Sequence, residues 1–146
     1  MEPFNLKNVE QAASLLSDVT SKTPLILNVQ KSNEFDANIY FKREDLQQVR
    51  SYKIRGAYNK ISHLNQTQKS EGIVCASAGN HAQGVAYSCQ VLQIQGKIYM
   101  PKTTPKQKIK QVQLFGKSFD EQTLLNIAYS IEQQVNFKSQ VKDWWM

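Results

Sequence analysis

The chain has 146 residues, of which 40% are hydrophobic, and its formal charge at pH 7 is +6. This length and composition suffice for one ordinary domain with its own core, and they argue against a disordered chain. The sequence has no apolar run of about 18 residues that could cross a membrane, and no signal peptide follows Met1, so we expect a cytoplasmic protein.

The excess of basic residues raises the question of a nucleic-acid partner. Its densest stretch lies around a predicted helix start and carries Lys102, Lys106, Lys108 and Lys110. No aromatic residues are interleaved with these lysines, and no known nucleic-acid-binding module is present, so the stretch is interpreted as a solvated face. We expect neither nucleic acid nor a membrane as a partner.

The N-terminal third of the chain predicts one helix and two strands. Residues 8–16 form the helix, with Asn8 as its N-cap. Apolar residues predict a strand over 25–29 and a second over 39–42, which is entered through a turn at 36–38.

A second helix is predicted to follow Ser51, whose hydroxyl would cap it. Its apolar positions recur at helical spacing: Ile54, Ala57, Tyr58, Ile61 and Leu64. Lys53 falls in the first turn, where the positive end of the helix dipole and the charge of Arg55 both favour the neutral, nucleophilic amine. For a lysine taken alone, a solvated position on an amphipathic helix is the alternative.

Residues 72–77 form an apolar run that predicts a buried strand, and a helix follows it. One face of that helix carries Ala82, Val85, Ala86, Cys89 and Leu92. The join contains Gly79, Asn80 and His81, where a close backbone approach and the N–H groups of a helix start favour an anion. An ordinary turn between strand and helix is the alternative. Gly84, inside the helix, indicates a close neighbour.

Residues 97–100 predict a further strand, and Thr104 and Pro105 start a helix that ends at Gly116. Strands that alternate with helices in this way predict an α/β fold with an open parallel sheet flanked by helices.

The cysteines and histidines carry little further chemistry. Cys75 and Cys89 fall on predicted buried positions, so they are expected to be core residues without a disulfide or a metal site. His63 is predicted to lie at the surface. His81, at the anion-binding turn, is the one histidine that we would test.

Two motifs carry a resemblance to a known family: SYKIRGA at residues 51–57 and SAGNHAQG at residues 77–84. Weaker agreement occurs at residues 23–25, 41–47 and 100–105. In this order and spacing, residues 5–120 resemble the threonine dehydratases, also called threonine ammonia-lyases or deaminases, which are pyridoxal-phosphate enzymes. The resemblance implies part of a tryptophan synthase beta-like fold.

The resemblance also implies roles for individual residues. In that family, the lysine at the position of Lys53 forms a Schiff base with the cofactor, and the asparagine at the position of Asn80 hydrogen-bonds the cofactor's ring hydroxyl. The loop that receives the substrate carboxylate corresponds to Ser77, Ala78, Gly79, Asn80 and His81.

The implied reaction is the deamination of L-threonine to 2-oxobutanoate and ammonia, in isoleucine biosynthesis or threonine catabolism. A serine-directed lyase or a racemase of the same family is one alternative. Serine racemases, however, carry a serine at the position of Ala78, and an alanine cannot move protons. A second alternative is an inactive fragment that acts only by association with another chain.

The resemblance covers only part of the family's catalytic domain. The family binds the cofactor phosphate in a run of consecutive glycines, whereas no two of the six glycines in this chain are adjacent. We expect residues 1–120 to be the N-terminal part of that domain, residues 121–146 to be a divergent helix and tail, and the C-terminal half to be absent. Alone, the chain should be inactive, and the intact family enzyme is expected to be a homo-oligomer.

Overall fold

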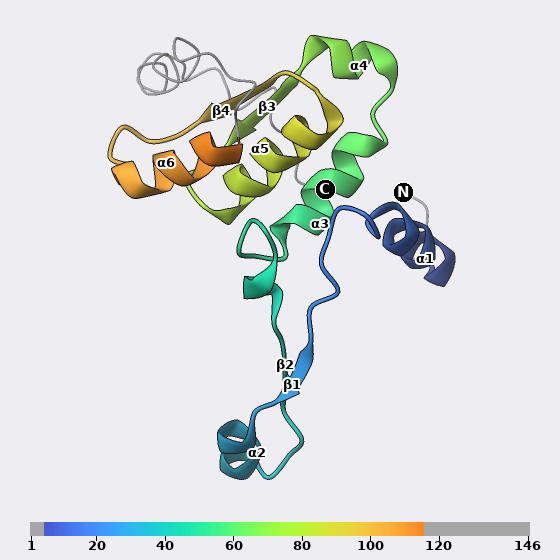
Figure 1. Cartoon of the computed structure of the whole chain (residues 1–146), viewed down its shortest axis with the longest axis vertical. Coiled ribbons are helices and arrows are strands. Elements are labelled where there is room, and N and C mark those ends of the chain that lie inside the picture. The colour runs from blue at the N-terminus through green and yellow to red at the C-terminus, as the bar shows by residue number, and fades with distance from the viewer. Residues whose placement is uncertain (1–4, 116–146) are drawn as a thin grey trace.

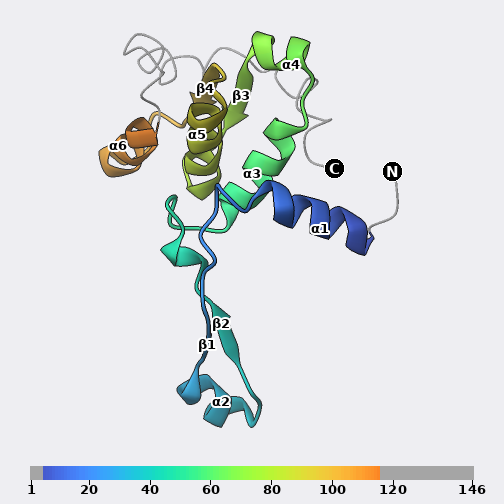
Figure 2. The same cartoon turned by 45° about the vertical axis from the view of Figure 1, so that its right-hand side comes forward.

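The computed structural model describes residues 5–115. The elements of this part, in chain order, are α1 (Leu6–Leu15), β1 (Leu25–Leu27), α2 (Val29–Phe35), β2 (Tyr40–Lys42), a 3₁₀ turn η1 (Glu44–Leu46), α3 (Lys53–Ser62), α4 (Gln66–Glu71), β3 (Ile73–Ala76), α5 (Asn80–Leu92), β4 (Gly96–Tyr99) and α6 (Lys106–Phe115). Residues 24–42, which hold β1, α2 and β2, form what we call the arm. In Figures 1 and 2 the arm extends away from a body built from α3 to α6.

The body contains two parallel strands joined by a helix. β3 pairs with β4, with Ile73 opposite Gly96 and Ala76 opposite Tyr99. α5 makes the crossover between the strands, and both α3 and α6 pack along it (Figure 1). The predicted α/β fold, with a parallel sheet flanked by helices, is confirmed.

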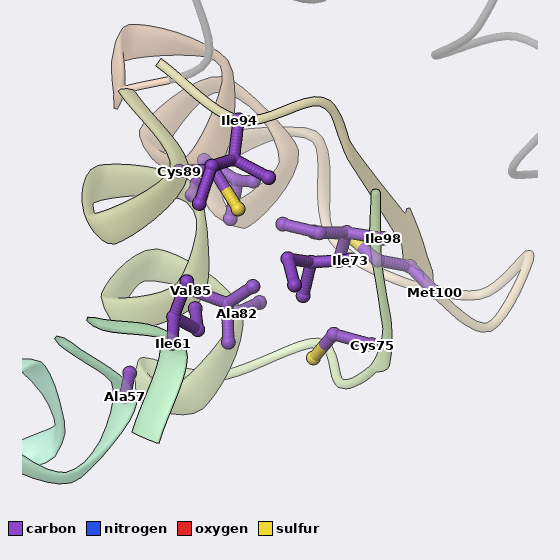
Figure 3. Close-up of a cluster of buried hydrophobic side chains, with 12 residues drawn as sticks. Ala57, Ile61, Ile73, Cys75, Ala82, Val85, Cys89, Ile94, Ile98 and Met100 are labelled. Atoms are coloured by element: carbon purple, nitrogen blue, oxygen red, sulfur yellow. The ribbon is translucent and has the colours of Figure 1, made fainter. Parts of the chain in front are cut away.

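The core lies between this sheet and the helices. Figure 3 shows side chains from both gathered there, among them Ala57, Ile61, Ile73, Val85, Ile94, Ile98 and Met100. Cys75 and Cys89 are free and buried in the same cluster, as predicted. Burial raises the pKa of the Cys75 thiol to about 11 and that of the Cys89 thiol to about 12, so both stay protonated and unreactive.

The strand predicted as buried is covered on one face only. In β3, Ile73 and Cys75 are buried whereas Val74 and Ala76 are exposed. Successive side chains of a strand point to opposite faces, and the helices of the described residues cover one of them. A continuous apolar run therefore leaves an exposed apolar side chain, Val74, on the other face.

The arm is an antiparallel pair and not part of the predicted parallel sheet. Leu25 opposes Lys42, and Leu27 opposes Tyr40. The reason lies in the connection, because α2 is only seven residues long and sits at the tip of the arm (Figure 2). The chain therefore returns beside itself instead of crossing over the sheet.

α2 also replaces the end of the strand predicted over residues 25–29. The Oδ1 atom of Asn28 accepts the N–H of Lys31 at 2.8 Å, so Asn28 caps a helix that begins at Val29. Asp36, in the left-handed region with φ of 47°, ends this helix and turns the chain back.

Two predicted helix starts are wrong in detail. Asn8 lies inside α1 and donates its N–H to Oδ1 of Asn5 at 2.9 Å, so Asn5 is the N-cap. The hydroxyl of Thr104 donates to the carbonyl of Pro101 at 2.6 Å and does not cap α6, and Pro105 precedes the first helical residue. In each case a polar side chain had more than one backbone partner within reach, and the local sequence does not decide between them.

α3 and α5 approach closely at Gly84, as a glycine inside a helix predicts. A Cβ atom at this position would lie 3.0 Å from the carbonyl oxygen of Lys53 and 3.3 Å from the nitrogen of Ile54. The first turn of α3 therefore packs directly on the backbone of α5. Gly56, by contrast, would meet nothing within 4 Å.

We expect Gly84→Ala to destabilise the body and Gly56→Ala to stabilise it slightly. At position 84 the added methyl group must displace the α3 backbone, and such overpacking costs about 1–3 kcal/mol. At position 84 this cost outweighs the gain of about 1 kcal/mol from replacing a helical glycine, whereas at position 56 that gain is the only effect. Urea unfolding measures both variants. Equal midpoints would contradict the close approach.

Candidate active site

Lys53 is the first residue of α3, in the first turn as predicted. Tyr52 occupies the N-cap position without a side-chain cap, and Oγ of Ser51 accepts the N–H of Lys53 at 3.4 Å. The predicted cap therefore lies one residue too early, although its hydroxyl still faces a free N–H group. The Nζ atom of Lys53 lies 5.1 Å from the centre of the Tyr52 ring. Within residues 5–115 no carboxylate pairs with this amine.

Arg55 directs its charge away from Lys53 and into an ion pair. Its Nε and Nη2 atoms donate to the two carboxylate oxygens of Glu44 at 2.8 and 2.9 Å. The Glu44 side chain is only 14% exposed, and the hydrogen bond from Arg55 is the main cause that lowers its pKa to about 2. The charge of Arg55, which was expected to favour the neutral amine of Lys53, is therefore compensated by Glu44.

Glu44 also ties α3 to the chain that enters the arm. Its Oε1 accepts the hydroxyl of Thr23 at 2.6 Å, and Nε2 of Gln47 donates to its Oε2 at 3.2 Å. Gln47 is fully buried and bonds both the N–H and the carbonyl of Ser21, each at 2.9 Å. A carboxylate with this many donors is firmly held, so the helix that begins at Lys53 is fixed relative to the base of the arm.

α5 begins with an open first turn. Gly79 is the N-cap and provides no capping side chain, and its N–H donates to Oγ of Ser77 at 3.3 Å. The N–H groups of Asn80, His81 and Ala82 have no hydrogen-bond partner among the described residues. An uncapped helix start of this kind, with its dipole, favours an anion.

The structure brings this turn to Lys53. Asn80 lies one turn before Gly84, and hence on the face of α5 that meets the backbone of Lys53. Burial, and then the charge of Lys53, lower the pKa of His81, so the amine and the imidazole share one electrostatic environment. His63, at the end of α3, is exposed as predicted, and its Nδ1 contacts the carbonyl of Asn59 at 2.7 Å.

The described residues contain no group of three or more His, Cys, Asp or Glu side chains that could hold a metal ion. None of their helices is long and apolar enough to span a membrane. The site thus places a lysine amine and an uncapped helix start on two helices that pack together, and such groups are suited to binding an aldehyde and a carboxylate.

A family model described as "pyridoxal-phosphate dependent enzyme" matches residues 16–135, a range that includes Lys53 and all of α5. The chain belongs to this family. The biosynthetic L-threonine dehydratase IlvA of Bacillus subtilis is 56% identical over 116 residues, which cover 80% of this chain and 28% of that protein.

Solved structures of pyridoxal-phosphate enzymes agree with the fold. The processed form of threonine deaminase isoform 2 from Solanum lycopersicum is 42% identical with a TM-score of 0.65, over 77% of this chain and 34% of that one. A serine racemase from Dictyostelium discoideum is 31% identical with a TM-score of 0.71, over 77% and 36%. The chain thus spans about a third of the length of the family members that it matches.

The described residues fit the reactive side of pyridoxal phosphate. Lys53 would supply the amine that its aldehyde requires. The Asn80 side chain lies on the face of α5 that meets Lys53 and makes no hydrogen bond within residues 5–115. The fit does not extend to the phosphate, because the six glycines of the chain are all isolated from one another.

The sequence did not single out Thr23, Glu44 or Gln47 as parts of the site. Glu44 and Gln47 lie within the weaker matching stretch at residues 41–47, and Thr23 lies within the one at 23–25. A signal was therefore present, but neither stretch indicates that Thr23 and Glu44 meet, or that Glu44 also binds Arg55.

The Glu44–Arg55 pair should make the stability of the chain depend on pH. The Glu44 carboxyl titrates with an ordinary pKa of 4.5 when unfolded and with one of about 2 when folded. Because the folded value is the lower one, the stabilisation is complete above about pH 5 and is lost as the pH falls through about 2. Glu44→Gln should cost about 1–3 kcal/mol at neutral pH and less in acid.

Asp45→Asn is the matched control, because Asp45 is exposed and pairs with Arg43 at the surface. Urea unfolding from neutral to acid pH compares the two variants. Equal losses of stability in both, or a cost of Glu44→Gln that does not shrink in acid, would contradict the assigned network.

Proposed function

We propose that the chain is the N-terminal part of the catalytic domain of an enzyme that deaminates L-threonine to 2-oxobutanoate and ammonia. The observation that supports it best is the packing of the first turn of α3 on α5, which sets the Lys53 amine near the open helix start at Asn80. The threonine dehydratase and deaminase names of similar proteins supply the reaction.

In this proposal Lys53 has two tasks. Its Nζ atom first holds pyridoxal phosphate covalently, and later takes the proton from the α-carbon of the substrate. Bound pyridoxal phosphate supplies the sink for the electron pair that this proton leaves behind. The β-hydroxyl then leaves as water, and hydrolysis of the resulting enamine by another water gives 2-oxobutanoate and ammonia.

The turn from Ser77 to His81 has the positioning task. Its free N–H groups bind the substrate carboxylate and so direct the α-hydrogen toward Lys53. The Asn80 amide donates to the ring hydroxyl of the cofactor. Its side chain has no hydrogen-bond partner within residues 5–115, so it is available for this role.

Ala78 favours elimination over racemisation. Its side chain packs partly against the core and carries no group that can give or take a proton. Racemisation needs a proton donor on the opposite face of the substrate, and this turn provides none at position 78. The names of the bacterial relatives further favour a biosynthetic role. We also propose that the intact protein is a cytoplasmic homo-oligomer without a nucleic-acid partner.

Treatment of the chain with pyridoxal phosphate and then borohydride should fix the cofactor mainly on Lys53. Peptide mapping by mass spectrometry locates the label. Lys53→Ala should remove most of it, whereas Lys60→Ala, a change at an exposed lysine on the same helix, should leave it in place. Label spread evenly over exposed lysines, and unchanged in Lys53→Ala, would rule out the assigned role.

When the chain is joined to the remaining part of the Bacillus subtilis relative, L-threonine should be deaminated with hardly any D-threonine formed. The expected ratio of deamination to racemisation is about 100 or more, the lower end of what a positioned acid–base group contributes. Chiral chromatography and a 2-oxobutanoate assay measure the two products. D-threonine at a comparable rate would refute the argument from Ala78.

A further inference from the structure

The aromatic ring of Tyr52 lies against the amine of Lys53. The Nζ atom of Lys53 stands over the ring, 5.1 Å from its centre, which is within the distance at which a cation is attracted to the face of a ring. The ring is 60% exposed, so burial in the core does not account for its place in the structure.

Tyr52 is also an unusual residue for its position in the helix. It is the N-cap of α3, a position that prefers Ser, Thr, Asp or Asn, and it makes no side-chain cap. Its backbone is already helical, with φ of −66° and ψ of −11°. The side chain therefore serves neither the helix start nor the core, and what it contacts is a cation.

The other titratable groups of α3 and α5 do not stabilise a charge on Nζ. Among the described residues no carboxylate pairs with Lys53, and Glu44 is occupied by Arg55. On α5, which packs against α3, burial and then the charge of Lys53 lower the pKa of His81, so its imidazole is neutral at pH 7. Tyr87 on the same helix is neutral as well, because burial raises its pKa.

The position of Lys53 gives such stabilisation a purpose. Lys53 lies in the first turn of α3, where the positive end of the helix dipole disfavours an ammonium. As a base, Nζ binds the α-proton of the substrate with its lone pair, and the electron pair of the broken C–H bond passes to the sink that pyridoxal phosphate supplies. The amine thus becomes an ammonium where the helix opposes it. The negative face of an aromatic ring offsets this opposition.

We propose that Tyr52 is a positioning residue whose ring holds the Lys53 nitrogen and stabilises the ammonium that forms when Lys53 takes the α-proton. The part in proton transfer rests on the proposed function, whereas the effect on the charge of Nζ does not. The ring of a phenylalanine serves this role too, and an aliphatic side chain of similar size does not.

The first test measures the charge on Nζ without any cofactor. A trace of acetic anhydride acetylates only neutral amines, so the rate at which a lysine is labelled reports its neutral fraction. Peptide mass spectrometry gives the rate for Lys53 relative to that for Lys60, an exposed lysine on the same helix. At about pH 8 this ratio should rise about two- to fivefold in Tyr52→Leu and stay unchanged in Tyr52→Phe.

The pH dependence separates charge from access, because removal of the ring also uncovers Nζ. A gain in access raises the ratio by the same factor at every pH, whereas the effect of charge disappears at about pH 11, where amines are mostly neutral in every variant. Phe35→Leu is the matched control. It removes the ring that Lys31 faces at 5.6 Å in the arm, and it should leave the ratio for Lys53 unchanged.

The second test measures proton transfer in the chain joined to the remaining part of the Bacillus subtilis relative. L-threonine with deuterium at the α-carbon slows proton removal, so that this step limits the rate. With this substrate, Tyr52→Leu should lower kcat about twofold and leave KM unchanged, because the ring acts on the charge that forms during the step. Tyr52→Phe should restore kcat.

Any of four outcomes would overturn the proposal. The acetylation ratio is the same in Tyr52→Leu as in the unchanged chain, its rise is equal at every pH, Tyr52→Phe behaves as Tyr52→Leu does, or kcat for the deuterated substrate does not change in Tyr52→Leu. A failure of the proposed function gives a different result. Borohydride labelling then misses Lys53, while the acetylation ratio still changes as expected.

Discussion

The close packing of α3 on α5 is the constraint on which the arrangement of this molecule depends. A backbone carbonyl, that of Lys53, occupies the space where any other residue at position 84 would have a side chain. Two helices in such contact cannot slide or rotate without a clash, because protein interiors are packed as densely as crystals. The first turn of α3 is therefore held against α5 by a steric contact between backbones.

A second constraint, of a different kind, acts from the other side of α3. The Glu44 carboxylate collects hydrogen bonds from Arg55, Thr23 and Gln47, and so joins the first helix turn to a stretch some thirty residues earlier in the chain. The strength of this link depends on pH because the link is ionic. The steric contact at Gly84 does not depend on pH. The position of Lys53 is thus fixed along two directions by two independent interactions.

The sequence predicts the body well and the arm poorly, for a physical reason. Apolar residues at helical spacing place α3 and α5 correctly, and Gly84 is recognisable as a site of close approach because glycine has no other advantage inside a helix. The path of the arm depends on where α2 turns back, which Asn28 and Asp36 decide locally. α4, with its Asn65 capping box, was also not predicted, because its short polar sequence has no apolar period.

Within the site, the sequence predicts which residues are the candidates for chemistry, but it does not predict the hydrogen bonds that hold them in place. Lys53 and the turn at Asn80 follow from motifs whose residue types have a chemical meaning. The ring of donors around Glu44 could not be predicted, because a carboxylate beside Arg43 and Asp45 in the sequence gives no sign of which cation it selects in space.

The body also has a consequence for biosynthesis. Lys53, the parallel strand pair and the uncapped helix α5 all come from one continuous stretch, residues 53–99. Contacts between residues near in sequence form early and fast, and domains fold as they leave the ribosome. In any longer chain built on this plan, Lys53 is already in place against α5 while the remaining two thirds of the polypeptide are still being translated.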